Sequence, residues 1–360
     1  MHISFLIPSL GSGGAERVVS ILASSLAERG HEVDVVMLAN RHRDYRLSEK
    51  VNVVYLDCEQ DQGLKTGKRY RLRLQKIRRA IKQLHPDVAV SFMSETNIDT
   101  CLSMRFSRIP LVVSERNDPK TDPASRLKQW LRRLAYHKPR GFVFQTPDAQ
   151  AYFSRRIQKR SEIILNPLSE KLPLPWQNAR EKRVVAVGRL NRQKNFPMLI
   201  EAFSRFLKEH PDYILEIYGD GVLRESLQAL VSEKGLADKV LFRGFCTDVH
   251  EKIRSAEMFV MTSDFEGMPN ALAEAMAMGI PCISTDCPCG GPRFLMKHME
   301  NGILVPVKDT EKTYRAMCYM VENPEEASKM GQEAYHVRER MDASAITEQW
   351  ERFIQKCCEE

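Results

Sequence analysis

The sequence predicts an α/β protein with two domains, each built around a doubly wound parallel sheet. Short apolar segments of strand length alternate with longer amphipathic segments along the whole chain. Apolar strands separated by helices are typical of parallel sheets that helices cover on both faces. The chain has 360 residues, which is too long for one ordinary core and suits two domains.

Twelve segments have the length and composition of buried strands. The first lies in the apolar start Met1–Pro8, which has no basic leader and no small-residue cleavage site, so we expect a strand there and not a signal peptide. The segments of the first half are Ile3–Ile7, Glu32–Leu38, Val51–Leu56, Val88–Phe92, Leu111–Ser114 and Gly141–Gln145. Those of the second half are Arg183–Val187, Tyr213–Tyr218, Val240–Phe242, Met258–Thr262, Pro281–Ser284 and Gly302–Val305.

Helical patterns fill most of the intervals, for example Glu16–Arg29, Pro197–Glu209 and Asn270–Met278. The segment Asn166–Arg180 contains three prolines and has no periodicity, which indicates a domain boundary. We therefore expect an N-terminal domain over residues 1–168 and a C-terminal domain over residues 169–341. A further helix, roughly Ser344–Cys358, lies beyond the last strand.

The composition is that of a soluble globular protein, with 43% hydrophobic and 28% charged residues. Nine cysteines without metal-ligand spacing predict free thiols in a reducing compartment. The net charge of +7 is uneven: residues 1–165 hold 29 Lys and Arg against 17 Asp and Glu, and the remainder holds 25 against 30. An anionic partner is therefore expected at the N-terminal domain.

Three loops carry the candidate chemistry, because ligands bind open parallel sheets at the carboxyl ends of the strands. The first loop, Gly11–Arg17, follows the first strand and opens a helix. Its Gly13 and Gly14 let the backbone approach an anion, and the amides of a helix start carry partial positive charge. The glycine spacing is not the dinucleotide-binding fingerprint, and a plain tight turn is the alternative interpretation.

The second loop places Gly188 and Arg189 directly after the first strand of the C-terminal domain, with Lys194 five residues after Arg189. Arg189 offers a planar fork to phosphate oxygens, and Lys194 offers a compact charge. The alternative interpretation is a solvated basic loop.

The third loop runs from Glu266 through Gly267-Met268-Pro269 to Asn270, and Glu274 follows on the first turns of a helix. Two carboxylates at this spacing can accept hydrogen bonds from sugar hydroxyls, one on a hexose and one on a ribose. The alternative is that Glu274 faces solvent and that Glu266 is an ordinary acidic residue of a turn.

Together these segments resemble the retaining glycosyltransferases of family 4, which have the GT-B fold of two Rossmann-like domains facing a central cleft. The resemblance covers nearly the whole chain and includes Gly13–Arg17, Gly188–Leu190 with Lys194-Asn195, Gly219–Gly221, and Glu266 and Glu274 with seven residues between them. The segments Ser114–Asn117 and Asp286–Pro292 resemble the subgroup that builds bacterial surface polysaccharides and lipid-linked oligosaccharides.

The resemblance also implies roles. Arg189 and Lys194 would hold the donor diphosphate, Glu266 the hydroxyls of the donor hexose, and Glu274 the ribose. The C-terminal segment 342–360 would cross back onto the N-terminal domain. Further donor contacts would come from Gly13, Gly14, Gly188, Met268, Asn270 and Ala271.

The sequence departs from the family at Arg116, where many relatives carry a histidine close to the reacting sugar. An arginine stays protonated and cannot act as a base. Arg116 would instead stabilise the departing phosphate or fix an acceptor group.

No Asp-x-Asp pair is present to hold a metal against a diphosphate, so we expect a metal-independent reaction without a cofactor. The resemblance implies that the donor is a UDP-linked hexose or N-acetylhexosamine. It also implies that the anomeric configuration is retained and that a diphosphate oxygen accepts the proton of the acceptor hydroxyl. The expected acceptor is a glycan, carried on a lipid diphosphate, in cell-envelope polysaccharide assembly.

A basic run at residues 65–82 contains nine Lys and Arg and no acid, with apolar residues at helical spacing. It predicts a cationic amphipathic helix that contacts anionic lipid at the inner leaflet and keeps a cytoplasmic protein on that membrane. A solvated surface helix is the alternative.

Two functions compete with sugar transfer: a GT-B nucleotide-sugar epimerase and a nucleic-acid-binding protein that uses the basic N-terminal face. The run has no interleaved aromatic residues, and no nucleic-acid partner is expected.

Overall fold

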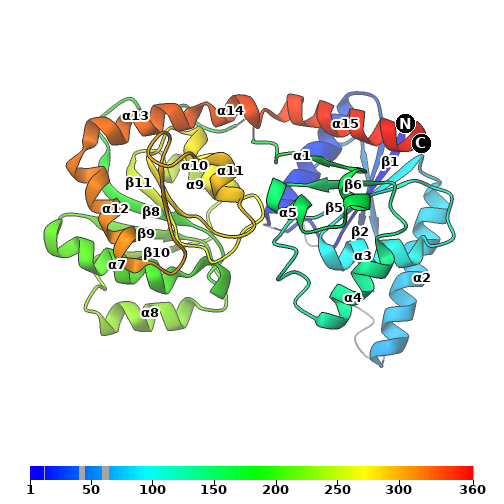
Figure 1. The fold of residues 1–360 in the computed structure, drawn as a ribbon, viewed down its shortest axis with the longest axis horizontal. Helices are drawn as coiled ribbons and strands as arrows, with labels where there is room; N and C mark the ends of the chain where they lie inside the picture. The colour runs from blue at the N-terminus through cyan, green and yellow to red at the C-terminus, as the bar shows by residue number, and fades with distance from the viewer. Residues whose placement is uncertain (12, 40–44, 59–64, 170, 360) are drawn as a thin grey trace. The chain divides into compact units, whose positions relative to one another are not determined.

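The computed structural model describes residues 1–11, 13–39, 45–58, 65–169 and 171–359. The chain divides into two compact units (Figure 1). Unit 1 comprises Met1–Pro167 together with Asp342–Glu360, and unit 2 comprises Leu168–Met341. The division after Pro167 lies one residue before the boundary that the prolines indicate.

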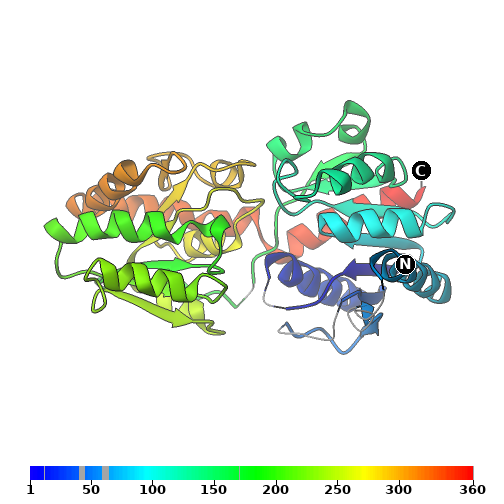
Figure 2. The same cartoon turned by 90° about the horizontal axis from the view of Figure 1, so that it is seen from below.

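Unit 1 contains, in the described residues, a seven-stranded parallel sheet in the order β3-β2-β1-β4-β5-β6-β7. Figures 1 and 2 show α2, α3 and α4 on one face of this sheet. The elements are β1 (His2–Ile7), α1 (Gly14–Glu28), β2 (Glu32–Met37), β3 (Val51–Tyr55), α2 (Thr66–Leu84), β4 (Val88–Phe92), α3 (Ser94–Ser103), β5 (Leu111–Ser114), α4 (Arg126–Ala135), β6 (Gly141–Phe144), α5 (Pro147–Ala151), α6 (Arg155–Gln158), β7 (Ser161–Ile163) and α15 (Ala343–Glu359).

The C-terminal helix α15 is part of the core of unit 1. It packs against α1, and its buried Trp350 stacks on Phe92 at 5.4 Å between ring centres. Arg29 Nη1 lies 3.0 Å from Glu351 Oε2 across the same contact. The apolar residues of α1, α15 and the central strands form one cluster, so the last helix of the chain contributes to the first core.

Unit 2 contains, in its described part, a six-stranded parallel sheet in the order β10-β9-β8-β11-β12-β13. The helices α7 and α12 pack against each other over one core. The elements are β8 (Glu181–Val187), η2 (Arg192–Lys194), α7 (Phe196–Glu209), β9 (Ile214–Tyr218), α8 (Arg224–Glu233), β10 (Val240–Gly244), α9 (Val249–Ile253), β11 (Ala256–Met261), α10 (Asn270–Ala277), β12 (Cys282–Thr285), α11 (Gly291–Leu295), β13 (Ile303–Val305), α12 (Thr310–Glu322), α13 (Pro324–Tyr335) and α14 (Val337–Arg340).

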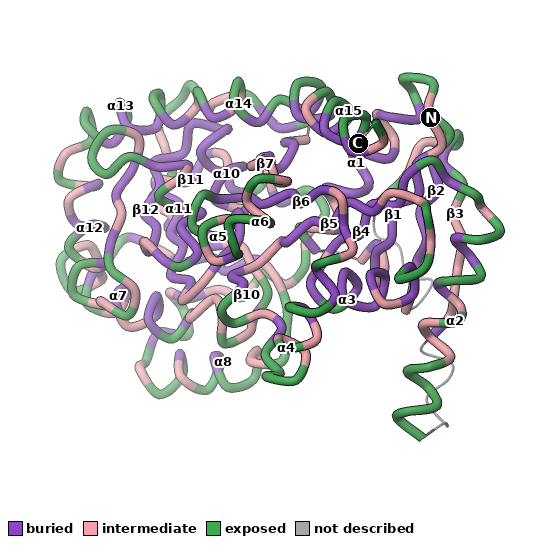
Figure 3. Tube along the Cα trace, turned by 45° about the vertical axis from the view of Figure 1, so that its right-hand side comes forward, coloured by how far each residue is buried: buried purple, intermediate pink, exposed green. Residues whose placement is uncertain are grey.

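All twelve predicted strands are present, with ends that differ by up to two residues. The prediction missed β7, a three-residue edge strand whose Ser161 and Glu162 break the apolar pattern. The basic run forms the helix α2, which buries Ile77 and Ile81 and leaves its basic residues mostly exposed (Figure 3). All nine cysteines are free thiols.

The strand order fixes where loops meet. In each sheet the chain winds outward in both directions from two neighbouring strands, β1 and β4 in unit 1 and β8 and β11 in unit 2. Loops after these strands leave from the same edge, which is the ligand-binding edge of such sheets. None of the helices in the described residues has the length and hydropathy needed to cross a membrane.

Candidate active site

The ligand-binding edge of unit 2 brings Lys194 and Glu266 together. Lys194 follows β8 and Glu266 follows β11, and these two strands are neighbours in the sheet. Lys194 Nζ lies 2.6 Å from Glu266 Oε1, and the two side chains are 17% and 9% exposed. A charge-assisted contact at this distance fixes both side chains at the edge where a ligand would sit.

Lys194 is held by its neighbours in the loop. Asn191 caps the short helix η2 by accepting a hydrogen bond from the Lys194 amide at 3.3 Å. The next residue, Asn195, has φ of 46° and donates through Nδ2 to Asp264 Oδ1 at 2.9 Å. Thr262 Oγ1 also donates to the Lys194 carbonyl at 3.1 Å. The loop after β8 is thus tied to the loop after β11 at several points.

Arg189 occupies the outer part of the same loop. It is exposed, and no carboxylate of the described residues forms an ion pair with it. The backbone around it is tightly packed, since a Cβ on Gly219 would lie 2.0 Å from the Gly188 carbonyl oxygen and Gly219 has φ of +129°. These glycines let the loops after β8 and β9 touch, so that Arg189 points outward from a rigid base.

The segment Asp286–Pro292 forms hydrogen bonds with the backbone of Glu266 and packs closely against the same loop. The Glu266 amide donates to the Pro288 carbonyl at 2.6 Å, and the Cys289 amide donates to the Glu266 carbonyl at 2.8 Å. A Cβ on Gly291 would lie 1.9 Å from the Gly267 carbonyl oxygen, so only glycine fits there. Burial first, and then the Glu266 carboxylate, raise the pKa of the Cys287 thiol to about 12, which keeps this thiol neutral.

Glu274 is buried in the middle of the short helix α10, so it does not face solvent as an ordinary surface residue would. Its Oε2 lies 2.9 Å from Nε2 of His250 in α9. Pro269 caps the helix, Met268 is buried, and Asn270 and Ala271 are partly exposed at its first turn. Sequence reasoning missed His250, because a single histidine outside any motif gives no signal.

In unit 1, Gly13 is the residue before α1, and its carbonyl accepts a hydrogen bond from the Arg17 amide at 3.1 Å. Gly14 is the first residue of the helix. Both lie at the end of the loop that leaves β1, one of the two central strands. The local geometry is that of a helix N-terminus at the ligand-binding edge.

Arg116, two residues after β5, has a shielded guanidinium group. All three of its guanidinium nitrogens are hidden from solvent and have no hydrogen-bond partner among the described residues. The guanidinium carbon lies 4.9 Å from the centre of the Phe92 ring. Burial lowers the pKa of Arg116 to about 9, so the group remains charged at neutral pH. A shielded cation without a partner can bind an anion there.

The neighbouring Glu115 is buried in a polar network. The Tyr136 hydroxyl donates to Glu115 Oε1, and Arg132 Nη1 lies 3.8 Å from the same oxygen. Burial raises the pKa of Glu115 to about 7, although Arg132 and Tyr136 oppose the shift. Asn97 joins this network through Nδ2, which donates to the Tyr136 hydroxyl at 3.4 Å and to the Ser114 carbonyl at 2.9 Å. The sequence gives no sign of this network, because its members come from three separate segments of the chain.

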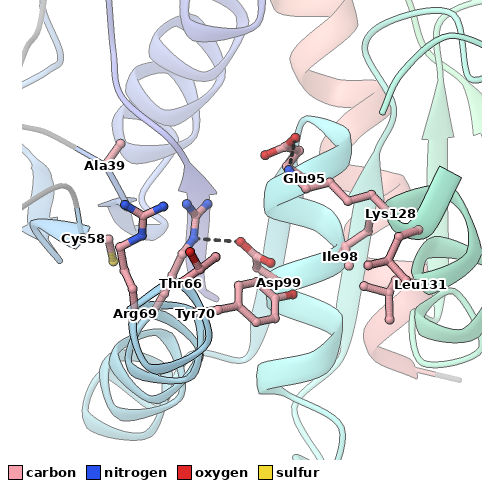
Figure 4. A pocket seen from close by; sticks show the side chains of 12 residues that line it. Ala39, Cys58, Thr66, Arg69, Tyr70, Glu95, Ile98, Asp99, Lys128 and Leu131 are labelled. Carbon is pink, nitrogen blue, oxygen red and sulfur yellow. Dashed lines mark hydrogen bonds and ion pairs between the residues drawn. The ribbon is translucent and has the colours of Figure 1, made fainter. Parts of the chain in front are cut away.

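A cavity of about 520 Å³ lies among α2, α3 and α4 (Figure 4). Thr66, Glu95 and Leu127 come from the first turns of these helices, so the cavity lies at the ligand-binding edge of unit 1. Arg73 Nε contacts Asp99 Oδ2 at 2.7 Å, and Lys128 pairs with Glu95. The remaining cation of the lining is Arg69, which has no ion pair with any described carboxylate.

The predicted residues therefore lie in two places. Gly13, Gly14 and Arg116 belong to unit 1, and the others belong to unit 2. One group in the described residues could hold a metal ion, with ligand atoms within 4.8 Å of one another. This group lies at the C-terminal ends of α7 and α12, at the sheet edge opposite Lys194 and Glu266, and consists of Glu209, His210, Cys318 and Glu322.

The comparisons with known proteins decide the family. A model described as "Glycosyltransferase Family 4" matches residues 12–171, and one described as "Glycosyl transferases group 1" matches residues 175–337. The chain is 30% identical to the N-acetylgalactosamine-N,N'-diacetylbacillosaminyl-diphospho-undecaprenol 4-alpha-N-acetylgalactosaminyltransferase of Campylobacter jejuni, covering 89% of this chain and 90% of that protein. The chain belongs to glycosyltransferase family 4. It is therefore a transferase enzyme, as the motifs predict.

Other matches agree with this family 4 assignment. A second C. jejuni enzyme is 28% identical over 98% of both chains, and its name is GalNAc-alpha-(1->4)-GalNAc-alpha-(1->3)-diNAcBac-PP-undecaprenol alpha-1,4-N-acetyl-D-galactosaminyltransferase. The crystal structure of Anabaena HepE with UDP-glucose matches with a TM-score of 0.85 at 19% identity, covering 99% of this chain and 100% of that one. The predicted GT-B fold is confirmed by this likeness and by the two parallel sheets.

Proposed function

We propose that this family 4 enzyme moves a hexose or N-acetylhexosamine from UDP to a glycan carried on a lipid diphosphate, with retention of configuration and without a metal. The observation that carries the proposal is the contact of Lys194 with Glu266 at the ligand-binding edge, beside the exposed Arg189. Two relatives support the acceptor, since both are named for diphospho-undecaprenol glycans. HepE supports the donor, since it was crystallised with UDP-glucose.

In the donor site, Arg189 and Lys194 neutralise the diphosphate as its negative charge grows. The Glu266 carboxylate accepts hydrogen bonds from hexose hydroxyls while its Oε1 holds Lys194 in place. Glu274, oriented by His250, accepts hydrogen bonds from the ribose. The amides near Asn270 and Ala271 are further polar donors in this site, and the amides of Gly13 and Gly14 offer a separate anion-binding helix start in unit 1.

Two fixed cations take the place of a metal. Preorganised positive charge stabilises a leaving diphosphate in the same way as a bound Mg²⁺, because both counter the charge that develops in the transition state. The acceptor hydroxyl attacks the face of the sugar that the diphosphate leaves. As it attacks, the bond between the anomeric carbon and the diphosphate oxygen breaks, and the acceptor oxygen bonds to the anomeric carbon. The acceptor proton passes to a diphosphate oxygen, and UDP departs.

Unit 1 supplies the acceptor side. The shielded Arg116 guanidinium has no hydrogen-bond partner in the described part of the chain and can bind a phosphate oxygen or an acceptor group. Arg69 projects from α2 into the cavity of Figure 4 and offers a second cation for the acceptor diphosphate. The exposed basic residues of α2 attract anionic lipid, which would hold the enzyme at the inner leaflet where such acceptors are made.

The test is a transfer assay in detergent with a panel of UDP-sugars and a short polyprenyl-diphosphate disaccharide. We expect UDP release only when donor and acceptor are both present, full activity in EDTA, and an α-linked product from an α-linked donor by NMR. Epimerisation would instead convert the donor without an acceptor. Activity that EDTA abolishes and Mg²⁺ or Mn²⁺ restores would contradict metal independence.

Arg116→Gln is the matching test on the acceptor side. Loss of the shielded charge should lower kcat/KM at least 10-fold, because a charge-assisted contact in a shielded site contributes about 1.5–3 kcal/mol. Arg116→Lys should recover part of that loss. An exposed cation of the same unit, Arg155, is the control, and Arg155→Gln should keep full activity. Equal activity in Arg116→Gln and Arg155→Gln would remove Arg116 from the site.

A further inference from the structure

The helix α4 leaves its apolar side exposed. Leu127, Trp130 and Leu134 are 65%, 55% and 52% exposed. They are three and four positions apart, so they lie along one stripe of the helix. Surface helices normally turn such a stripe toward the core, and an exposed apolar stripe marks an interaction surface.

The opposite side of α4 is buried although it carries a charge. Arg132 donates through Nη1 to the Asp122 carbonyl at 2.7 Å and through Nη2 to the Pro119 carbonyl at 2.6 Å. The buried Ala135 lies beside it. The arginine therefore anchors the helix with its apolar stripe facing outward, and rotation of the helix would break these hydrogen bonds.

The charges around the stripe identify its partner. Arg126 and Arg133 of α4 are exposed, and the helix contains no acidic residue. The basic helix α2 belongs to the same layer, packed on the other side of α3, and Leu127 and Arg69 line one cavity. An apolar stripe with an exposed tryptophan and flanking arginines is the pattern of a helix that lies in the surface of an anionic membrane.

We propose that α4 inserts Leu127, Trp130 and Leu134 into an anionic phospholipid bilayer, with α2 lying on the same surface. The proposal deepens the proposed function and rests on it for the lipid-linked acceptor. The basic face of α2 attracts the membrane from a distance, and the stripe of α4 then contributes the apolar contact that charge alone cannot. The cavity lined by both helices would then open near the lipid headgroups, within reach of an acceptor diphosphate.

The experiment uses the full chain and vesicles that contain neither donor nor acceptor, so it does not depend on transfer activity. Vesicles of phosphatidylcholine with about one third phosphatidylglycerol are floated with wild type and with the triple variant Leu127→Ser, Trp130→Ser and Leu134→Ser. We expect the variant to bind at least 10-fold more weakly. The matched control replaces three exposed apolar residues of unit 2 with serine and should bind like wild type; these residues are Leu174, Val222 and Phe245.

A second measurement distinguishes insertion from surface attraction. Trp130 fluorescence, taken as the difference between wild type and Trp130→Phe, should shift to shorter wavelength on vesicles and be quenched by brominated lipid. Unchanged vesicle binding by the triple variant, or no quenching, would overturn the proposal. Sedimentation without lipid is a third measurement. If wild type is a dimer and the triple variant is a monomer, the stripe binds a second copy of the chain, and the proposal is overturned. The transfer assay in detergent tests the proposed function separately.

Discussion

Neutralising both members of the Lys194–Glu266 pair separates a structural ion pair from a donor-binding pair. The variants are Lys194→Met, Glu266→Gln and the double variant, which all keep approximate side-chain volume. Each single change leaves one charge shielded and without its partner at 2.6 Å. The double change leaves no charge, so its stability should be close to wild type.

The magnitude follows from burial. Breaking a fully buried ion pair lowers the free energy of unfolding by about 3–5 kcal/mol. These two side chains are 17% and 9% exposed and so keep some contact with solvent. We therefore expect each single variant to lose about 2 kcal/mol. For a unit of this size that is a lowering of Tm by roughly 4–8 °C. The double variant should recover most of it. Transfer should behave differently, with kcat/KM reduced about 10²–10³-fold in all three variants, because each lacks a charge or acceptor aimed at the donor.

The assay pairs thermal unfolding with steady-state transfer on the same three samples. Recovery of Tm without recovery of kcat/KM in the double variant is the expected result. Near-wild-type turnover by the double variant would refute the reasoning, since the pair would then act only by holding two loops together. Additive loss of Tm in the double variant would show instead that each residue has stabilising contacts outside the pair.

Three further outcomes follow from the structure. The pKa of Glu115 is raised from 4.5 to about 7, so protonation stabilises the fold below about pH 5 and this contribution is lost as pH rises to about 7. Urea unfolding should show that the free energy of unfolding of wild type falls by about 2.5 kcal/mol more than that of Glu115→Gln between pH 5 and pH 8. Gly219→Ala should lower Tm by several degrees and reduce activity, because its Cβ would clash with the Gly188 carbonyl oxygen. Gly67→Ala is the control and should raise or preserve Tm, since a Cβ there meets no atom. Equal effects of the two substitutions would contradict the contact with Gly188. His250→Ala should raise the donor KM about 10-fold with kcat less affected, and an unchanged KM would show that Glu274 does not depend on His250.

Local patterns were enough to predict the strands and the fold class. Apolar strands such as Ile3–Ile7 and Val88–Phe92 are buried on both faces, and this burial is what makes a parallel strand recognisable in sequence. The prolines of Asn166–Arg180 marked the segment within which the chain divides, after Pro167. β7 was missed because an edge strand with Ser161 and Glu162 has no such apolar run.

The site was predicted as a set of motifs but not as an arrangement. Glu266 and Lys194 were found in separate loops, and their contact across 72 positions depends on β8 and β11 being neighbours. Periodicity gives strands without giving their order, so no local pattern could place one side chain against the other. His250 had no motif at all, and it reaches Glu274 only because α9 and α10 flank the same strand, β11.

The sequence alone thus determined the family motifs, the two parallel sheets and the basic charge of the N-terminal half. The tertiary structure decided which charges are paired and which are not. Arg132 and Arg116 are both arginines of one basic domain. Arg132 donates hydrogen bonds to backbone carbonyl groups, whereas the shielded Arg116 guanidinium has no partner among the residues that the structure describes. That difference, like the outward apolar stripe of α4, arises from packing between segments far apart in the chain. Local sequence patterns give no information about such packing.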